Sequence, residues 1–187
     1  VATGGHRAVL ASPVGRSALL ETVARPVLRR YGDHPAVEAW DVFNEPEWAT
    51  LGFGSANATR AVWPGSMRLL LGDLVTAVHD ETRHAATVGL ASVAGLPLLM
   101  GIDVDVYHVH WYDRLSSFVQ EMTGRLSKPL VLGEFPTKGS AFPVGEILRG
   151  ARERGYAGAL GWAALAGDDY SDLDGLEAAL RGPRPLV

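Results

Sequence analysis

Two glutamates each follow a short apolar run that has the composition of a β-strand. Glu45 comes after residues 39–43, inside the sequence Asn44-Glu45-Pro46, and Glu134 comes after residues 130–132, inside Gly133-Glu134-Phe135-Pro136. A proline has no N–H group to donate to a neighbouring strand, so Pro46 is expected to end the first of these strands. A carboxyl group at the tip of a strand is a candidate for acid–base or nucleophilic chemistry.

The elements that must position these carboxyl groups alternate along the chain. Apolar residues at helical or alternating spacing, punctuated by Gly and Pro, predict an order in which strands follow helices. The expected helices span 17–31, with a possible kink at Pro26, and 66–84, 115–126, 144–154 and 172–181; the expected strands span 39–44, 86–90, 104–112, 130–136 and 157–164; residues 1–14 and 48–65 are expected to be loops.

Strands that alternate with helices form parallel βαβ units, and right-handed crossovers place the carboxyl ends of all strands at one edge of the sheet. Glu45, His110, Glu134 and Trp162 all occupy such ends. In (β/α) barrels this is the face that holds the chemistry. The topology therefore predicts that these four residues share one face of the fold.

The two glutamate segments together resemble those of the retaining glycoside hydrolases built on (β/α)8 barrels, the large clan that includes cellulases and mannanases. In that clan a Glu after Asn, at the end of the fourth strand, is the general acid/base, and a Glu at the end of the seventh strand is the nucleophile. The resemblance implies these roles for Glu45 and Glu134. It extends to residues 87–92 as the fifth strand, 110–112 as the sixth and 158–165 as the eighth.

The same resemblance assigns further site residues. Asn44 is similar to the residue that binds the sugar 2-hydroxyl, His110 and Tyr112 to residues that hydrogen-bond the nucleophile and the substrate, and Trp162 to the tryptophan on which a sugar stacks. Adjacent residues of a regular strand point to opposite faces, so Asn44 and Glu45 can serve one site only if the strand end is bulged or turning.

A retaining mechanism makes two demands on the pair of carboxyl groups. They must lie about 5–5.5 Å apart on opposite sides of the scissile bond. The pKa of Glu45 must also lie above its usual range, so that it is protonated at neutral pH; burial and the nearby charge of Glu134 would have that effect.

The expected fold is α/β: a partial TIM-type (β/α) barrel of about five parallel strands with surrounding helices, forming a single domain over residues 1–187. A complete barrel usually needs about 250 residues, and this chain has 187. The resemblance covers strands four to eight, so the expected barrel lacks the first three βα units.

Composition excludes several kinds of partner. The net charge is −4 and no run of basic residues occurs, which argues against nucleic acid. No apolar stretch approaches about 18 residues, so no membrane partner is expected. The first residues do not follow the plan of a signal peptide, and we expect a soluble chain whose leader is absent or already removed. The chain has no cysteine, which leaves its localisation unknown.

Neither a cofactor nor a metal ion is expected. His108 and His110 are two residues apart on one strand face and could bind a metal, but no third ligand is evident. The acidic residues Asp168, Asp169, Asp172 and Asp174 depart from the spacing of a calcium loop, and a helix-capping loop is the better interpretation.

Two functions from different classes fit this sequence. The first is retaining hydrolysis of a β-linked glycoside, a glucan or mannan, with a site that is complete in this chain or completed by another. The alternative is a catalytically weak or inactive partial barrel, or a barrel fragment, of structural or carbohydrate-binding interest. A five-strand sheet leaves two exposed edges, so we also expect a homo-oligomer, most simply a dimer, that covers them.

Overall fold

The computed structural model describes residues 7–112, 126–165 and 167–181. The chain is α/β, and its five parallel strands form one sheet in the order β1-β2-β3-β4-β5. This architecture confirms the expected partial (β/α) barrel. The chain folds as two compact units, Val1–Tyr107 and His108–Val187. None of the helices in the described residues is long and apolar enough to cross a membrane.

Unit 1 begins with helices where the sequence predicted a loop. Helix α1 spans Arg7–Ala11 and helix α2 spans Pro13–Leu19. The side chain of Ser12 caps α2 by accepting a 3.2 Å hydrogen bond from the N–H of Gly15. Pro13 follows at the first helical position, where its missing N–H is not needed. The expected loop over 1–14 is therefore wrong from Arg7 onward, and the Ser12-Pro13 pair is the signal that starts α2.

The helix predicted over 17–31 is present but widened in its middle. A π-helical segment, η1 (Leu20–Ala24), separates α2 from α3 (Arg25–Tyr31), and the N–H of Arg25 bonds the carbonyl of Leu20, five residues earlier. Pro26 has no N–H and its ring would collide with the preceding turn of a regular helix. The extra residue per turn just before Pro26 relieves this conflict without ending the helix.

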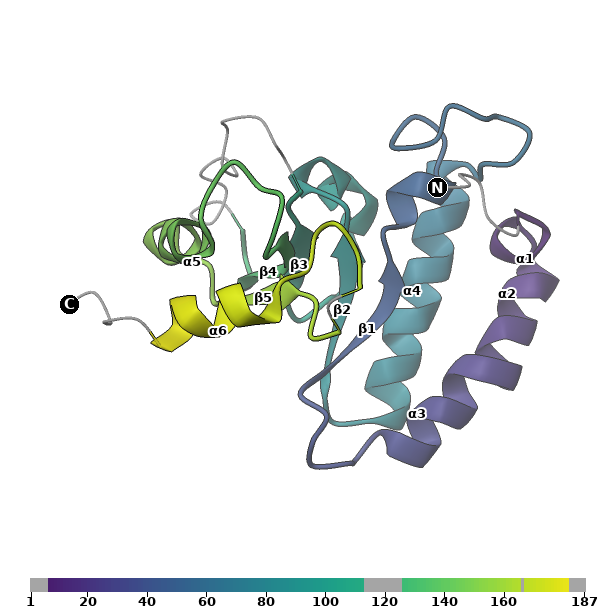
Figure 1. Ribbon diagram of the computed structural model, residues 1–187. Coiled ribbons are helices and arrows are strands. Elements are labelled where there is room, and N and C mark those ends of the chain that lie inside the picture. The colour runs from purple at the N-terminus through teal and green to yellow at the C-terminus, as the bar shows by residue number, and fades with distance from the viewer. Residues whose placement is uncertain (1–6, 113–125, 166, 182–187) are drawn as a thin grey trace. The chain divides into compact units, whose positions relative to one another are not determined.

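The core of unit 1 lies between one long helix and two strands. Helix α4 (Pro64–Glu81) packs against β1 (Ala39–Asn44) and β2 (Ala85–Leu90), and in Figure 1 it lies between these strands and the α1–α3 run. Strand β2 is almost entirely buried, as a parallel strand covered on both faces should be. The buried face of α4 consists of Met67, Leu70, Leu71, Leu74, Val75, Ala77 and Val78.

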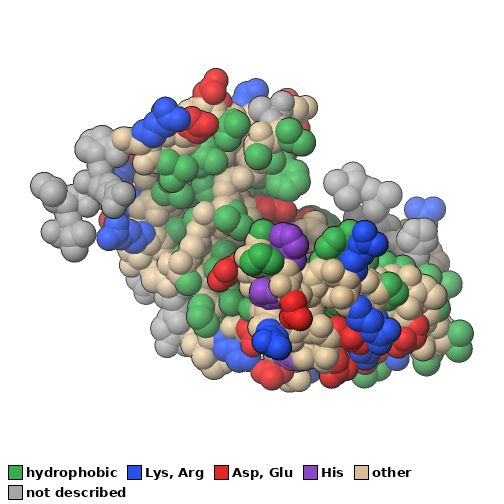
Figure 2. Space-filling model, turned by 90° about the horizontal axis from the view of Figure 1, so that it is seen from below, with side chains coloured by type: hydrophobic (Ala, Val, Ile, Leu, Met, Phe, Trp, Pro, Cys, Tyr) green, Lys and Arg blue, Asp and Glu red, His purple; other side chains and the backbone are tan. Residues whose placement is uncertain are grey.

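Charged side chains join α3 to α4. Arg25 Nη1 and Arg29 Nε donate hydrogen bonds of 2.6 and 2.8 Å to the two oxygens of Glu81. Figure 2, which views the molecule from below, shows acidic and basic side chains side by side on the surface. The hydrogen bonds that Arg29 and Arg25 donate lower the pKa of Glu81 to about 2. This carboxylate therefore remains charged far into the acid range.

Two short helices continue the chain beyond the strand ends of unit 1. The 3-10 helix η2 (Pro46–Ala49) comes directly after Glu45, and η3 (Val93–Leu99) comes after β2. Strand β3 is Tyr107–His110, shorter than the predicted span of 104–112. Just before it, the N–H of Asp105 bonds the carbonyl of Ala86, so this segment already runs beside β2.

Unit 2 has two strands backed by two helices. Strands β4 (Leu130–Pro136) and β5 (Gly158–Trp162) pair in parallel, and α5 (Val144–Glu153) packs on both strands and on α6 (Leu173–Arg181). Trp111 is buried against the ring of Phe142, with 5.9 Å between the ring centroids. Nearly all of the helix expected over 115–126 lies outside the described residues.

Candidate active site

Glu134 lies where the regular ladder of β4 and β5 is interrupted. The register of the two strands shifts between Leu132 and Phe135, and Glu134 falls inside this irregularity. A bulge of this kind turns a side chain away from strict alternation. The Glu134 side chain is 19% exposed, so solvent reaches it although it is mostly covered.

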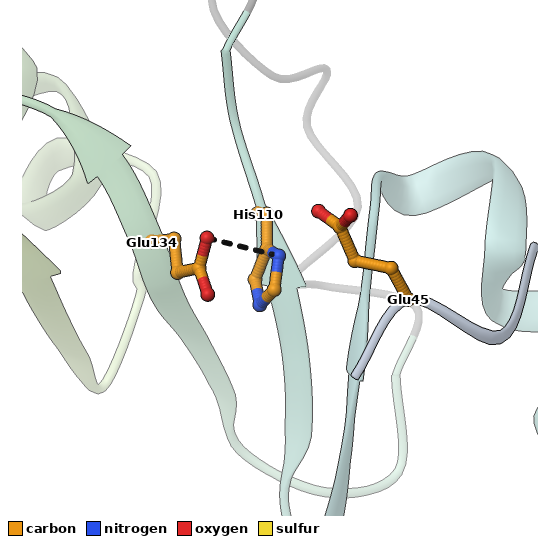
Figure 3. A group of neighbouring side chains, drawn as sticks. All are labelled: Glu45, His110 and Glu134. Atoms are coloured by element: carbon orange, nitrogen blue, oxygen red, sulfur yellow. Dashed lines mark ion pairs between the residues drawn. The ribbon is translucent and has the colours of Figure 1, made fainter. Parts of the chain in front are cut away.

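Two side chains of unit 2 converge on one oxygen of Glu134. The hydroxyl of Tyr112 donates a 3.0 Å hydrogen bond to Oε2, and Nδ1 of His110 lies 3.4 Å from the same atom. Figure 3 shows His110 and Glu134 directed toward each other from β3 and β4. The N–H of Trp111 also bonds the carbonyl of Glu134, which fixes its backbone. Donors aimed at a carboxylate oxygen stabilise the negative charge there.

A glycine makes room for the histidines behind this carboxylate. A Cβ atom on Gly133 would lie 1.4 Å from Nε2 of His108, so any larger residue would displace the ring. The rings of His108 and His110 meet edge to face, with 5.1 Å between their centroids. His110 is 1% exposed. The close approach of His108 to Gly133 therefore packs the ring of His110, whose Nδ1 faces Glu134.

The end of β1 is also irregular. The register with β2 shifts between Asp41 and Asn44. The N–H of Gly89 donates a 2.9 Å hydrogen bond to Oδ1 of Asp41. A side-chain oxygen thus takes the place of a backbone carbonyl between the two strands. Glu45 then adopts a left-handed conformation with φ 48° and ψ 59°, and among the described residues it is the one non-glycine residue with positive φ. The bulge or turn required before Glu45 is confirmed, and Asn44 is exposed at its start.

A left-handed conformation in a non-glycine residue costs about 1 kcal/mol or more and persists only where its surroundings enforce it. Here the N–H of Glu45 bonds the carbonyl of Gly89 at 2.6 Å. The indole Nε1 of Trp48 donates a 2.7 Å hydrogen bond to Oε2 of Glu45. Trp48 is absent from the site residues predicted from the sequence. The sequence signal for this contact was the position of Trp48, three residues after Glu45 in a turn that begins with Pro46.

Trp162 ends β5 and is held by a side chain that the sequence did not assign to the site. Its indole Nε1 donates a 2.8 Å hydrogen bond to Oδ2 of Asp168. Hydrogen bonds from Trp162, the Tyr170 N–H and the Ser171 hydroxyl keep the pKa of Asp168 below its usual value. Trp162 is 39% exposed, so its ring is available to a ligand. The Tyr170 ring meets that of Tyr112 edge to face at 5.5 Å, which links this group to the partner of Glu134.

Asp172, in the same acidic loop after β5, binds the backbone. The N–H of Gly175 donates to Oδ1 of Asp172 at 3.1 Å, so Asp172 caps α6, as the interpretation of this cluster as a helix-capping loop predicted. In the same unit, Nδ1 of His110 and Oε2 of Glu134 are atoms of the kind that ligate metal ions.

The structure thus brings His110, Tyr112 and Glu134 together in unit 2, and places Asn44 and Glu45 together at the end of β1 in unit 1. No protein-family model matches the chain, and no curated protein matches it by sequence.

Several solved structures share the fold. A GH128 (subgroup II) endo-beta-1,3-glucanase from Sorangium cellulosum aligns with a TM-score of 0.54 and 18% identity, over 88% of this chain and 77% of the glucanase chain. Endo-glycoceramidase II from Rhodococcus sp. aligns in two complexes, with a five-membered iminocyclitol and with a cellobiose-like imidazole. Their TM-scores are 0.52 and 0.51, at 17% and 16% identity over 83% of this chain. The chain spans 42% of the glycoceramidase length. The fold is therefore one that glycoside hydrolases use.

Proposed function

We propose that this chain is a retaining glycoside hydrolase that cleaves a β-linked glycoside, a glucan or mannan, with Glu134 as the nucleophile and Glu45 as the general acid/base. The observation that carries the proposal is the environment of Glu134, a strand-end carboxylate whose Oε2 receives the Tyr112 hydroxyl at 3.0 Å. The parallel sheet also supports the proposal, because it contains both β1 and β4 and each glutamate lies toward the carboxyl end of its strand. The endo-beta-1,3-glucanase neighbour supports the choice of a β-linked glucan as a substrate to test.

The chemistry takes two displacements. In the first, Glu134 attacks the anomeric carbon while the carboxyl proton of Glu45 passes to the departing glycosidic oxygen, which leaves a covalent glycosyl-enzyme. In the second, the Glu45 carboxylate removes a proton from water, and the resulting hydroxyl displaces Glu134 from the same carbon. Both carboxyl groups return to their initial protonation states, and the configuration at the anomeric carbon is retained.

The remaining predicted residues act on the sugar. We assign Asn44 to the 2-hydroxyl, His110 to the nucleophile and substrate, and Trp162 to stacking against a sugar ring. The exposed and hydrogen-bonded indole of Trp162 fits this role, because its orientation is fixed before a ligand arrives. Trp48 joins this set as the donor to the proposed acid/base.

The test is hydrolysis of soluble β-1,3-, β-1,4- and mixed-linkage glucans, mannans and aryl β-glycosides by four variants. Glu45→Gln and Glu134→Gln are expected to lose turnover by at least about 10³-fold. Glu38→Gln and Glu146→Gln remove an exposed carboxylate from unit 1 and from unit 2, and both variants are expected to retain turnover. Proton NMR of the first product should show the β anomer. Substantial turnover by Glu134→Gln, or an α product, contradicts the mechanism.

Self-association is proposed for the edge of the sheet. Strand β1 is the terminal strand in the sheet order, and a groove of about 350 Å³ lies between it and the η1–α3 helices. Val23 and Val27 line this groove and are 52% and 42% exposed. A second copy that covers β1 and this groove would form the expected dimer. Sedimentation equilibrium should yield the mass of a dimer at micromolar concentration, and a monomer throughout that range would contradict it.

This association is also what the alternative function requires. A partial barrel that binds carbohydrate without cleaving it would give no turnover with any substrate while still self-associating and binding sugar. The hydrolysis panel separates the two functions, because self-association is expected for both. We propose further that residues 1–187 unfold as a single domain, which predicts coincident thermal transitions for probes placed in the two units.

A further inference from the structure

Glu47 is a buried carboxylic acid two residues after Glu45. It lies in η2 and is 5% exposed, although glutamate is among the residues least often buried. The N–H groups of Thr50 and Gly54 both bond its carbonyl at 3.0 Å, so its backbone is fixed against the residues that come next in the chain. The backbone of the turn that carries this buried side chain is therefore held by two hydrogen bonds.

The carboxyl group fills a space left by a glycine. A Cβ atom on Gly95 would lie 2.0 Å from Oε1 of Glu47 and 2.7 Å from its Cδ. The N–H groups of Ala91 and Ser92 lie near enough to favour the charged form. Among the described residues, however, neither carboxyl oxygen has a hydrogen bond of ordinary length and angle. The group is packed tightly and solvated poorly.

No cation on the adjoining segments compensates for a charge at this position. Residues 46–55, which form the turn and its loop, and residues 85–99, which form β2 and η3, contain no Lys, Arg or His, and Glu47 is their one ionisable side chain. The charged group nearest in the sequence, Glu45, has the same sign. Burial is the main cause that raises the pKa of Glu47 above its usual 4.5, and the charge of Glu45 adds to it.

Glu47 also lies on the segment that holds Glu45 in place. The N–H of Glu45 bonds the carbonyl of Gly89, and the N–H of Trp48 bonds the carbonyl of Glu45 at 3.2 Å. Ala91 and Ser92, which face the Glu47 carboxyl, come two and three residues after Gly89. Backbone and side chain therefore attach the same turn to the same end of β2.

We propose that Glu47 is a positioning residue for Glu45: as a neutral, buried carboxyl group it holds η2 against the end of β2, and loss of its proton loosens the turn that orients Glu45 and Trp48. The structural part of this inference stands on the packing of Glu47. Its catalytic consequence rests on the proposed function, in which Glu45 is the acid/base.

The structural part is tested by NMR on protein with 13Cδ-labelled glutamate and 15N-labelled tryptophan indoles. The Glu47 resonance should titrate above pH 4.5, and the Trp48 indole N–H should shift with the same midpoint, since its acceptor is Glu45. Glu47→Gln resembles the protonated acid, so in this variant the Trp48 shift at that midpoint should disappear. Glu47 titration at or below 4.5, or a Trp48 shift unchanged in Glu47→Gln, would overturn the proposal. The wild-type titration decides the matter even if the variant does not fold.

The catalytic part is tested by the pH profile of kcat. Glu47→Gln should retain kcat within about threefold of the wild type below the midpoint and extend activity on the alkaline side. Glu47→Asp, which is too short to fill the space beside Gly95, should lower kcat at least tenfold with KM within about twofold, and Glu38→Gln should match the wild type. An alkaline limb unchanged in Glu47→Gln contradicts the positioning role. Absence of turnover in every protein, with the NMR results as expected, rejects the proposed function and leaves the role of Glu47 in the turn intact.

Discussion

The Tyr112 hydroxyl and the Glu134 carboxylate form a 3.0 Å hydrogen bond in which the phenol donates to Oε2. Tyr112 lies just beyond β3 and Glu134 within β4, so the bond joins two neighbouring strand ends of unit 2. Its geometry fixes one oxygen of the proposed nucleophile.

Tyr112→Phe removes the donor and keeps the ring, including its edge-to-face contact with Tyr170. A hydrogen bond to a charged group contributes about 1.5–3 kcal/mol, so kcat/KM is expected to fall about 10- to 100-fold. Thermal stability should change little, because Tyr112 is only partly buried. Steady-state kinetics beside a melting curve is the measurement. Wild-type kcat/KM in Tyr112→Phe would show that the bond has no role in the reaction.

Gly133→Ala is expected to destabilise the fold. The new Cβ would lie 1.4 Å from Nε2 of His108, and the ring is packed against His110. Overpacking of this kind costs about 1–3 kcal/mol. The matched control is Gly145→Ala on α5, where a Cβ meets nothing within 4 Å and should stabilise the helix by about 0.5–1 kcal/mol. Urea unfolding of both variants checks the sign of each change, and equal stabilities would contradict the close packing of His108.

Stability in acid should depend on Glu81. The hydrogen bonds from Arg29 and Arg25 lower its pKa from 4.5 to about 2 in the folded chain. A carboxylate whose pKa is lowered by folding stabilises the protein fully above its unfolded pKa and loses that contribution as the pH falls through the folded value. The stability difference between wild type and Glu81→Gln should therefore be constant above pH 4.5 and shrink toward pH 2.

The control for this experiment is Glu177→Gln, which removes an exposed pair with Arg181 on α6. Exposed pairs of this type contribute between 0 and about 1 kcal/mol. Urea unfolding at several pH values gives both comparisons. A wild-type advantage over Glu81→Gln that stays constant down to pH 2 would contradict the arginine contacts.

Asp168 is expected to control sugar binding through Trp162. Asp168→Ala removes the acceptor of the 2.8 Å bond from the indole Nε1, and the ring then loses its fixed orientation. Affinity for β-glucan oligosaccharides should fall about 3- to 10-fold, consistent with one hydrogen bond. Asp168→Asn retains an acceptor oxygen and should bind nearly as the wild type does. Titration calorimetry measures both, and unchanged affinity in Asp168→Ala and Trp162→Ala would remove Trp162 from the site.

Much of this fold is predictable from local patterns. The apolar spacing of 66–84 marks α4 to within a few residues, and the alternation of strands with helices gives the parallel sheet. Pro46, after Glu45, was expected to end its strand, and β1 does end at Asn44 with an irregular register. These features depend on residues close together in the sequence, which is where pattern-based reasoning is strongest.

The features that were missed depend on context that the sequence does not display. Helix α2 starts in a segment rich in Gly and Pro because Ser12 supplies a cap, and Pro26 produces a π-helical turn in place of a break. Burial of Glu47 contradicts the usual exposure of its residue type and requires the space beside Gly95. The bond from Trp162 to Asp168 likewise depends on where the loop after β5 folds back.

The central claim is that Glu134 becomes covalently attached to the sugar. A 2-deoxy-2-fluoro β-glycoside with a good leaving group slows both displacements, but its leaving group keeps the first fast enough for the glycosyl-enzyme to accumulate. After incubation, intact mass spectrometry should show one added fluoroglycosyl unit, and peptide mapping should place it on Glu134. The adduct should be absent in Glu134→Gln and present in Glu146→Gln. An adduct on another residue, or none from a substrate analogue that the wild type hydrolyses, would contradict the assignment of Glu134 as the nucleophile.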